Sequence, residues 1–273
     1  MASPILVTGG TGTLGRLVVP LVRGAGREVR VLSRNARPSD DSGVAYVACD
    51  LLAGAGIEDA LDGVDTVLHL AGGPKGDDLA TRNLVAAASR AGVKHLVYIS
   101  VIGADTVPLG YFRAKLGAER AVEESGIPWT TLRAAQFHDL VLTMMEKMAK
   151  LPVVPVPGMR LQPVDAREVA ARLVELTLGE PAGRVADLAG PEVYGMRDLT
   201  RTYLGARGKR RPLLPVRVPG KAGRAYRAGD NLSLEHAVTG TRTWEDFLAE
   251  RVERVERVER VERAERVGER GRE

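Results

Sequence analysis

The chain has 273 residues, of which 44% are hydrophobic and 27% are charged, a composition typical of a globular protein. Its 39 Lys and Arg residues against 35 Asp and Glu leave a net charge of +4, too small a surplus to indicate a nucleic-acid-binding protein. A single cysteine excludes an intrachain disulfide and a cysteine-based zinc cluster, and it fits a reducing cytoplasm.

The N-terminal segment runs from Met1 through Pro4 directly into the apolar residues Ile5 to Val7. It lacks the basic stretch followed by an apolar stretch that marks a signal peptide. Nowhere does the sequence hold the ~18 consecutive apolar residues of a membrane span. We therefore expect a cytoplasmic protein that does not bind a membrane.

Strand-like and helix-like segments alternate through the first 150 residues. This order is typical of βαβ units, in which a parallel sheet carries helices on both faces, so it predicts a doubly wound α/β fold. The expected strands are 3–8, 28–32, 44–48, 64–70, 95–100 and 128–132, and the expected helices are 13–23, 77–91, 110–125 and 134–150.

The pattern changes after Lys150. Four prolines within 151–163 exclude a helix there. We expect helices over 165–178 and 196–206, and a last strand over 184–188 that returns to the sheet. The basic, Pro- and Gly-rich stretch 207–227 is interpreted as a surface loop.

The C-terminal tail from Glu250 repeats Glu-Arg-Val and contains eight Arg and eight Glu residues, so it is neutral. An apolar residue at every third position spirals around a helix instead of forming the stripe that a coiled coil needs. The tail is therefore expected to be a solvated charged helix or disordered. A self-association segment is the alternative.

The strongest local signal is the sequence Thr8-Gly9-Gly10-Thr11-Gly12-Thr13-Leu14-Gly15, between the first expected strand and the first helix. In a phosphate-binding loop Gly9 would permit the tight turn, Gly12 the close approach of a pyrophosphate, and Gly15 the packing of helix on strand. The helix N-terminus would present N–H groups to the phosphates. No Lys-Ser or Lys-Thr pair follows the glycines, which argues against a P-loop NTPase.

The loop resembles that of the extended and atypical short-chain dehydrogenase/reductases, and especially of the NmrA-like NAD(P)-binding proteins. The order of elements extends the resemblance from Pro4 to about Leu178. It implies a Rossmann-like fold and a dinucleotide bound by Gly9, Thr11, Gly12, Thr13, Leu14 and Gly15.

The dinucleotide is expected to be NADP(H) in preference to NAD(H). An NAD site usually carries Asp or Glu at the end of the second strand, where this chain has Ser33 and Arg34. A guanidinium pairs well with a 2′-phosphate, and Arg37 can assist Arg34. A solvated surface arginine is the alternative for Arg34.

Two further segments match the family. The resemblance implies that Asp50 and Leu51, after the third strand, contact the adenine, although Asp50 fits a turn or helix cap equally well. It also implies that Ala71, Gly72 and Gly73, after the fourth strand, lie against the cofactor. The family's Asn-Ala-Gly element lacks its Asn here.

A Tyr and a Lys four residues apart, Tyr111 and Lys115, would share one helix face. Reduction of a ketone needs a proton donor, and a nearby ammonium would lower the pKa of the tyrosine. Ser100 ends the fifth strand, where its hydroxyl can bind the substrate oxygen. The resemblance implies that Ser100, Tyr111 and Lys115 are catalytic and that Lys115 also binds the nicotinamide ribose. A scaffold role for these residues is the alternative.

Weaker candidates follow the sixth strand, where the resemblance implies that Gln136, Phe137 and His138 border the nicotinamide and the substrate. The histidines lack the spacing of metal ligands, so no metal is expected.

We therefore expect an NADP(H)-dependent oxidoreductase that acts on a carbonyl or alcohol of a small molecule, including a quinone-like one. The alternatives are an NmrA-like redox sensor without turnover and an epimerase or dehydratase that retains its nicotinamide cofactor. The oligomeric state stays open. The expected parts are an NAD(P)-binding Rossmann-like core over 1–150, a small C-terminal substrate lobe over 151–249 with late sheet elements, and the tail over 250–273.

Overall fold

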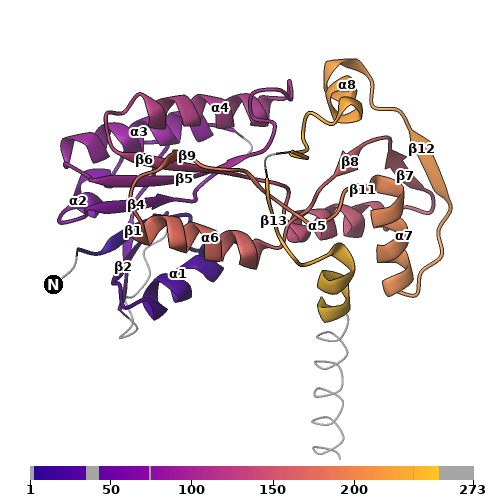
Figure 1. Cartoon of the computed structure of the whole chain (residues 1–273), viewed down its shortest axis with the longest axis horizontal. Coiled ribbons are helices and arrows are strands. Elements are labelled where there is room, and N and C mark those ends of the chain that lie inside the picture. Colours follow the sequence, from indigo (N-terminus) through magenta and orange to yellow (C-terminus); the bar gives the residue numbers. More distant parts are fainter. Residues whose placement is uncertain (1–2, 35–42, 74, 236, 252–273) are drawn as a thin grey trace, which may run out of the picture.

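A computed structural model describes residues 3–34, 43–73, 75–235 and 237–251 of the chain. Its main sheet is parallel, with the strand order β13-β10-β6-β5-β4-β1-β2-β3, and β9 also pairs with β6 (Figure 1). Its strands are β1 (Ile5–Thr8), β2 (Val29–Ser33), β3 (Val44–Ala48), β4 (Thr66–His69), β5 (His95–Val101), β6 (Trp129–Ala134), β9 (Gly183–Arg184), β10 (Leu188–Ala189) and β13 (Val238–Thr239). The predicted doubly wound α/β fold is confirmed.

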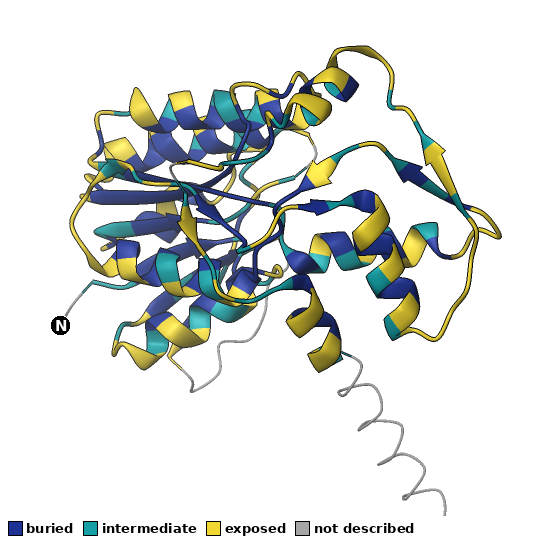
Figure 2. Ribbon diagram, turned by 45° about the vertical axis from the view of Figure 1, so that its right-hand side comes forward, coloured by how far each residue is buried: buried dark blue, intermediate teal, exposed yellow. Residues whose placement is uncertain are grey.

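Helices cover both faces of this sheet, with α3 and α4 on one side and α1 and α6 on the other (Figure 1). Alternate residues of each strand enter different cores: Ile5 and Val7 pack toward α1 and α6, whereas Leu6 packs toward α2, α3 and α4. The central strands β1, β4, β5 and β6 are almost entirely buried, whereas the helices expose their outer faces (Figure 2). The helices are α1 (Gly15–Gly24), α2 (Ile57–Leu61), α3 (Asp77–Arg90), α4 (Gly110–Glu123) and α6 (Ala166–Leu178).

The C-terminal lobe has its own apolar core, built by α5 (His138–Met148), α7 (Met196–Ala206) and the segment around Trp244. Two small sheets flank this core, one formed by β8 (Arg160–Leu161) and β11 (Tyr194–Gly195), the other by β7 (Val154–Pro157) and β12 (Leu213–Val216). Because β9, β10 and β13 join the main sheet, both halves of the chain contribute to it. The assignment of domains stays a prediction.

The expected surface loop over 207–227 is wrong, because it contains β12 and α8 (Gly220–Ala228). Val154 of β7 donates its N–H to the Pro212 carbonyl, and Gly158, just after β7, donates to the Val216 carbonyl. The backbone nitrogens of the alternate residues Pro155 and Pro157 therefore face away from β12. A strand can hold prolines at positions whose N–H is not needed for pairing. The proline content of these segments is therefore the reason that the sequence did not predict this pair of strands.

The two largest differences from the expected boundaries are the following. The helix expected to begin at Ala134 begins at His138, because β6 continues to Ala134 and the Ala135 N–H bonds to Leu188 of β10. The strand expected over 184–188 is split into β9 and β10. The tail prediction, including its alternative of self-association, concerns residues that lie mostly outside the described ones.

Candidate functional site

The carboxyl ends of four central strands meet at one edge of the sheet. The parallel registers pair Thr8 with His69, His69 with Tyr98, and Ser100 with Arg133. β1 lies between β2 and β4, where the strand order reverses direction, and open α/β sheets bind ligands at this point. The glycine loop, the segment after β4, Ser100 and the segment after β6 therefore share one edge.

The glycine loop follows β1 and leads into α1, as predicted. Gly9 has a φ of +67°, and a Cβ there would lie 2.7 Å from the Ala71 nitrogen. A Cβ on Gly15 would lie 2.3 Å from the Gly9 carbonyl oxygen, so helix and strand pack too closely for a side chain. A Cβ on Gly12 would meet only that same oxygen, at 3.3 Å. Gly12 thus faces open space, while Gly9 and Gly15 are required by packing.

This loop presents free hydrogen-bond donors. Gly12 donates to the Gly9 carbonyl, and Arg16 donates its side-chain Nε–H to the Thr11 carbonyl, which fixes the turn. The backbone N–H groups of Thr13, Leu14 and Gly15 have no acceptor among the described residues. These donors at the start of α1 fit the oxygens of a dinucleotide pyrophosphate.

At the end of β2, Ser33 is partly buried and Arg34 is exposed. Neither of these two positions, the last described ones before residue 43, carries a carboxylate. Arg37 lies outside the described residues. Asp50 accepts hydrogen bonds from the Leu52 and Ala53 N–H groups at 2.9 and 3.2 Å, so it stabilises a turn. This observation supports the turn-cap alternative for Asp50 and leaves its contact with adenine, and that of Leu51, as a prediction.

A buried hydrogen-bond chain links β1, β4 and α3 beneath the loop. Thr81 donates its hydroxyl to the Asp77 carbonyl at 2.7 Å, so its oxygen must accept from Nε2 of His69 at 3.0 Å. Nδ1 of His69 then accepts from the Thr8 hydroxyl at 2.6 Å. The Thr8 oxygen accepts from the N–H groups of Leu70 and Ala71, which fixes the backbone leading to Gly72.

His69 is therefore neutral, with its proton on Nε2. Burial lowers the pKa of His69 to about 4; the charge of Asp77 opposes this shift and that of Lys115 adds to it. The imidazole ring also stacks on Tyr98 at a centroid distance of 5.3 Å. The residue acts as a rigid spacer under the site and does not exchange protons near neutral pH.

Lys115 is buried and its ammonium has three partners. It lies 3.0 Å from the Asp77 carboxylate and donates to the Tyr98 hydroxyl and the Ile99 carbonyl, each at 3.2 Å. The Tyr98 hydroxyl in turn donates to Asp77. These contacts use all three N–H donors of the ammonium. A Cβ on Gly72 would lie 3.0 Å from Nζ, so this group sits directly below the Gly72 backbone.

Tyr111 lies at the start of α4 and keeps 39% of its surface exposed. The expected decrease in its pKa is wrong in this structure. Burial raises the pKa of Tyr111 to about 12, and the charge of Asp77 and the nearby Tyr226 contribute. Tyr111 is therefore protonated at neutral pH. Its catalytic role stays a prediction.

Several buried polar atoms on the same edge lack partners among the described residues. They are the Ser100 hydroxyl, Oε1 of Gln136 and both ring nitrogens of His138. Such atoms are costly unless a ligand or water satisfies them. His138 packs against Trp244 and Phe247, and burial lowers its pKa. Phe137 forms a bridge with Val164 and lies between Gln136 and His138.

Sequence reasoning missed Asp77 and Tyr98. Asp77 lies at the start of a helix, where an acidic residue is common, but it is 3% exposed and its carboxylate is the partner of Lys115. Tyr98 lies within a strand with no motif around it. In the described part of the chain, no three His, Cys, Asp or Glu side chains are placed to hold a metal, and no helix is long and apolar enough to cross a bilayer.

The sequence model of an NAD(P)H-binding family matches residues 9–175, which contain the glycine loop, the His69 chain and Lys115. The chain belongs to this NAD(P)H-binding family. The match spans more than half of the sequence and confirms the resemblance to the extended short-chain dehydrogenase/reductases.

Two relatives of this chain are reductases by name. The chain is 34% identical over 205 residues to the (4-alkanoyl-5-oxo-2,5-dihydrofuran-3-yl)methyl phosphate reductase of Streptomyces griseus, with 72% of this chain and 71% of that protein covered. It is 29% identical over 214 residues to the NAD(P)H azoreductase of Xenophilus azovorans, with 75% and 74% covered. The prediction of an NAD(P)H-dependent oxidoreductase is confirmed at the level of this class.

A solved structure has the same fold. The NADPH-dependent quinone oxidoreductase of Escherichia coli in complex with NADPH superimposes with a TM-score of 0.76 at 20% identity. The superposition covers 90% of this chain and 99% of the Escherichia coli chain. The C-terminal lobe is thus part of the shared fold.

Proposed function

We propose that this protein reduces a carbonyl group of a small organic molecule with NADPH. One arrangement carries the proposal. Among the described residues, a set of N–H donors at the end of β1 has no acceptor, and the buried Ser100 hydroxyl, two strands away on the same edge, has no partner. A dinucleotide whose pyrophosphate binds the N–H donors and that extends along the edge would bring its nicotinamide toward Ser100.

Each of the proposed site residues has its own role in the reduction. When bound, the reduced nicotinamide supplies a hydride to the carbonyl carbon and is itself oxidised. Ser100 donates a hydrogen bond to the carbonyl oxygen, and Tyr111 transfers its proton to that oxygen, which yields the alcohol. The tyrosinate then takes a proton from water. Gln136, Phe137 and His138 border the reacting carbonyl.

The protonation state of Tyr111 fits its proposed role. With its pKa raised to about 12 by burial, Tyr111 holds its proton at neutral pH and has a proton to donate. Lys115 supports the site indirectly, since with Asp77 it holds the backbone at Gly72 against which the cofactor lies.

The preference for NADPH over NADH rests on Arg34. This exposed guanidinium directly follows β2, where an NAD site carries a carboxylate. The phosphate of the adenosine ribose would lie beside it. We further place the protein in the cytoplasm, where NADPH and reduced thiols such as the single Cys49 are found.

The relatives guide the choice of substrate. By their names they act on an oxo-dihydrofuran phosphate and on azo compounds, which are small conjugated molecules. We propose conjugated carbonyl compounds, quinones included, as the class to screen. The partners are thus small molecules rather than nucleic acids or membranes.

The test is consumption of NADPH by the purified full chain across a panel of aldehydes, ketones and quinones. We expect turnover that falls at least 100-fold in Tyr111→Phe and about tenfold in Ser100→Ala, with NADPH affinity unchanged in both. Tyr203→Phe, which removes a hydroxyl from the buried core of the C-terminal lobe, serves as the control. Binding of NADPH without turnover would instead identify a redox sensor, and product without net NADPH loss an epimerase or dehydratase.

A further inference from the structure

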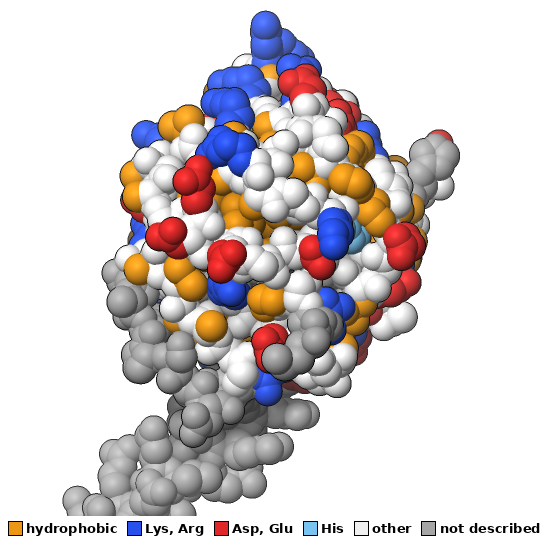
Figure 3. Space-filling model, turned by 90° about the vertical axis from the view of Figure 1, so that its left-hand side faces the viewer, with side chains coloured by type: hydrophobic (Ala, Val, Ile, Leu, Met, Phe, Trp, Pro, Cys, Tyr) orange, Lys and Arg blue, Asp and Glu red, His pale blue; other side chains and the backbone are white. Residues whose placement is uncertain are grey.

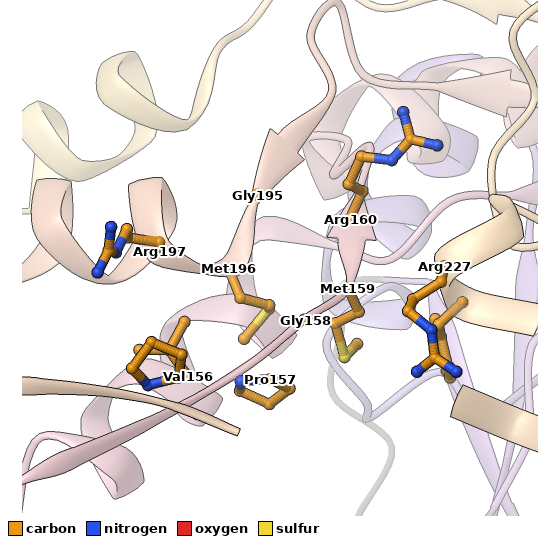
Figure 4. Close-up of a pocket in the computed structure, with 11 residues that line it drawn as sticks. Val156, Pro157, Gly158, Met159, Arg160, Gly195, Met196, Arg197 and Arg227 are labelled. Carbon is orange, nitrogen blue, oxygen red and sulfur yellow. The ribbon is translucent and has the colours of Figure 1, made fainter. Parts of the chain in front are cut away.

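A pocket of about 490 Å³ lies in the C-terminal lobe, between the two small sheets and α8 (Figure 4). Its floor is apolar. Met159, which directly precedes β8, and Met196, the first residue of α7, both line it (Figure 4). Val156, Pro157 and Pro215 complete this floor.

The rim of the pocket is positively charged. Arg160, Arg197 and Arg227 line it and come from three different elements, and in Figure 4 they lie on different sides of the two methionines. None of the ion pairs between described residues includes any of the three. Among the described residues that line the pocket there is no Asp or Glu.

The surrounding sequence strengthens this charge. Between Asp198 and Asp230 the chain has nine Lys and Arg residues and no Asp or Glu, although the net charge of the whole chain is only +4. A single-sign field of this kind attracts and concentrates an anion. On the opposite face of the molecule, shown in Figure 3, basic and acidic side chains are both scattered over the surface.

Tyr226 connects the pocket to the candidate active site. It lines the pocket and also packs against the apolar cluster that contains Phe112, the residue next to Tyr111. It lies close enough to Tyr111 to affect the ionisation of that phenol. Tyr226 is thus the residue that lies both at the pocket and near Tyr111.

We infer that this pocket binds the negatively charged end of the substrate, and that the substrate is a carbonyl compound that carries a phosphate monoester and an apolar portion. The inference rests on the proposed reductase function. The methionine floor suits the apolar portion because Met adapts to irregular ligands. A phosphate monoester carries about −1.5 to −2 charges at neutral pH, which matches several guanidinium groups better than a singly charged carboxylate does.

Three aldehydes on one scaffold test this inference: benzaldehyde, 4-formylbenzoate and 4-formylphenyl phosphate. With the full chain and saturating NADPH, we expect the phosphate compound to have a KM at least tenfold lower than benzaldehyde. Arg160→Gln, Arg197→Gln and Arg227→Gln should each raise the KM for the phosphate compound about tenfold and leave kcat and the KM for benzaldehyde within twofold.

Arg224→Gln is the matched control, because Arg224 lies on the same helix as Arg227 and its loss changes the charge equally, yet it does not line the pocket. It should leave all three KM values unchanged. Equal effects of Arg224→Gln and Arg227→Gln would overturn the inference in favour of a diffuse basic surface. Equal KM values for the neutral and phosphate aldehydes would also overturn it.

Calorimetric titration with 4-formylphenyl phosphate separates this inference from the proposed function. Binding that is lost in Arg227→Gln but not in Arg224→Gln, without any turnover, would support the pocket and contradict the reductase. Turnover of all three aldehydes with no dependence on Arg160, Arg197 or Arg227 would support the reductase and contradict the pocket.

Discussion

The ammonium of Lys115 and the carboxylate of Asp77 lie 3.0 Å apart, with side chains only 6% and 2% exposed, directly beneath the Gly72 backbone. This ion pair joins two helices below the edge of the sheet, because Lys115 comes from α4 and Asp77 from α3. The Tyr98 hydroxyl joins them by accepting from the one and donating to the other. Lys115 of the Tyr-Lys motif is thus held by an ion pair with Asp77, while its catalytic role and its contact with the nicotinamide ribose stay predictions.

Replacement of one partner of this ion pair should be costly. Asp77→Asn leaves the Lys115 ammonium buried without a counter-charge, so we expect the free energy of unfolding to fall by about 3–5 kcal/mol. Urea denaturation at neutral pH measures this loss. In the control, Arg82→Gln removes a partner of an exposed pair and should cost less than about 1 kcal/mol. A loss for Asp77→Asn as small as that for Arg82→Gln would contradict the structural role.

Two glycines of the loop should respond differently to alanine. Gly15→Ala drives a methyl group into the backbone of Gly9 and Gly10, which cannot move aside, so we expect a loss of stability of about 3 kcal/mol. Gly12→Ala meets only one atom, at 3.3 Å, and should fold with a stability within about 1 kcal/mol of the parent.

Gly12→Ala also tests the anion site. The methyl group of Gly12→Ala occupies the space through which the pyrophosphate would approach, so its affinity for NADPH should fall at least tenfold despite normal folding. Thermal unfolding and fluorescence titration with NADPH provide the two readouts. Unchanged NADPH binding by a folded Gly12→Ala variant would argue against this path for the pyrophosphate.

Arg34 should determine the choice of cofactor. Arg34→Ala removes the guanidinium assigned to the 2′-phosphate, and we expect the Kd for NADPH to rise about 10- to 100-fold, as for a charge-assisted hydrogen bond. The Kd for NADH, which lacks that phosphate, should change less than twofold and provides the internal control. Parallel losses for both cofactors would show that Arg34 acts elsewhere.

Acid should destabilise the fold through its buried histidines. His69 has a pKa of about 4 when folded and 6.5 when unfolded, so the unfolded chain binds the extra proton between these values. Its contribution is complete above pH 6.5 and is lost as the pH falls to about 4. It amounts to about 3 kcal/mol, from 1.36 kcal/mol per pKa unit. Burial also lowers the pKa values of His95 and His138, which adds to the loss in the same direction.

His69→Gln isolates the first of these contributions. Glutamine keeps one donor and one acceptor but does not titrate, so the variant should lose less stability than the parent between pH 6.5 and pH 4. Urea unfolding at a series of pH values gives both curves. Parallel pH dependences of parent and variant would contradict the neutral state assigned to His69.

The sequence by itself determined the parts that depend on local pattern. Alternating strand and helix signals identified the doubly wound sheet, and β3 was predicted with its observed bounds, because residue periodicity reflects burial directly. The glycine loop was also readable, since Gly9 has a positive φ in the turn after β1 and Gly15 packs against the backbone of Gly9 and Gly10, a few residues away.

Only the tertiary structure decided which charges meet. Lys115 is four residues from Tyr111 but pairs with Asp77, 38 positions away in the sequence, because the packing of α3 against α4 brings the two carriers together beneath β4 and β5. The same holds for the pocket, where Arg160, Arg197 and Arg227 converge from β8, α7 and α8. Electrostatic partners depend on distance in space and on burial, and neither is encoded in the spacing of a motif.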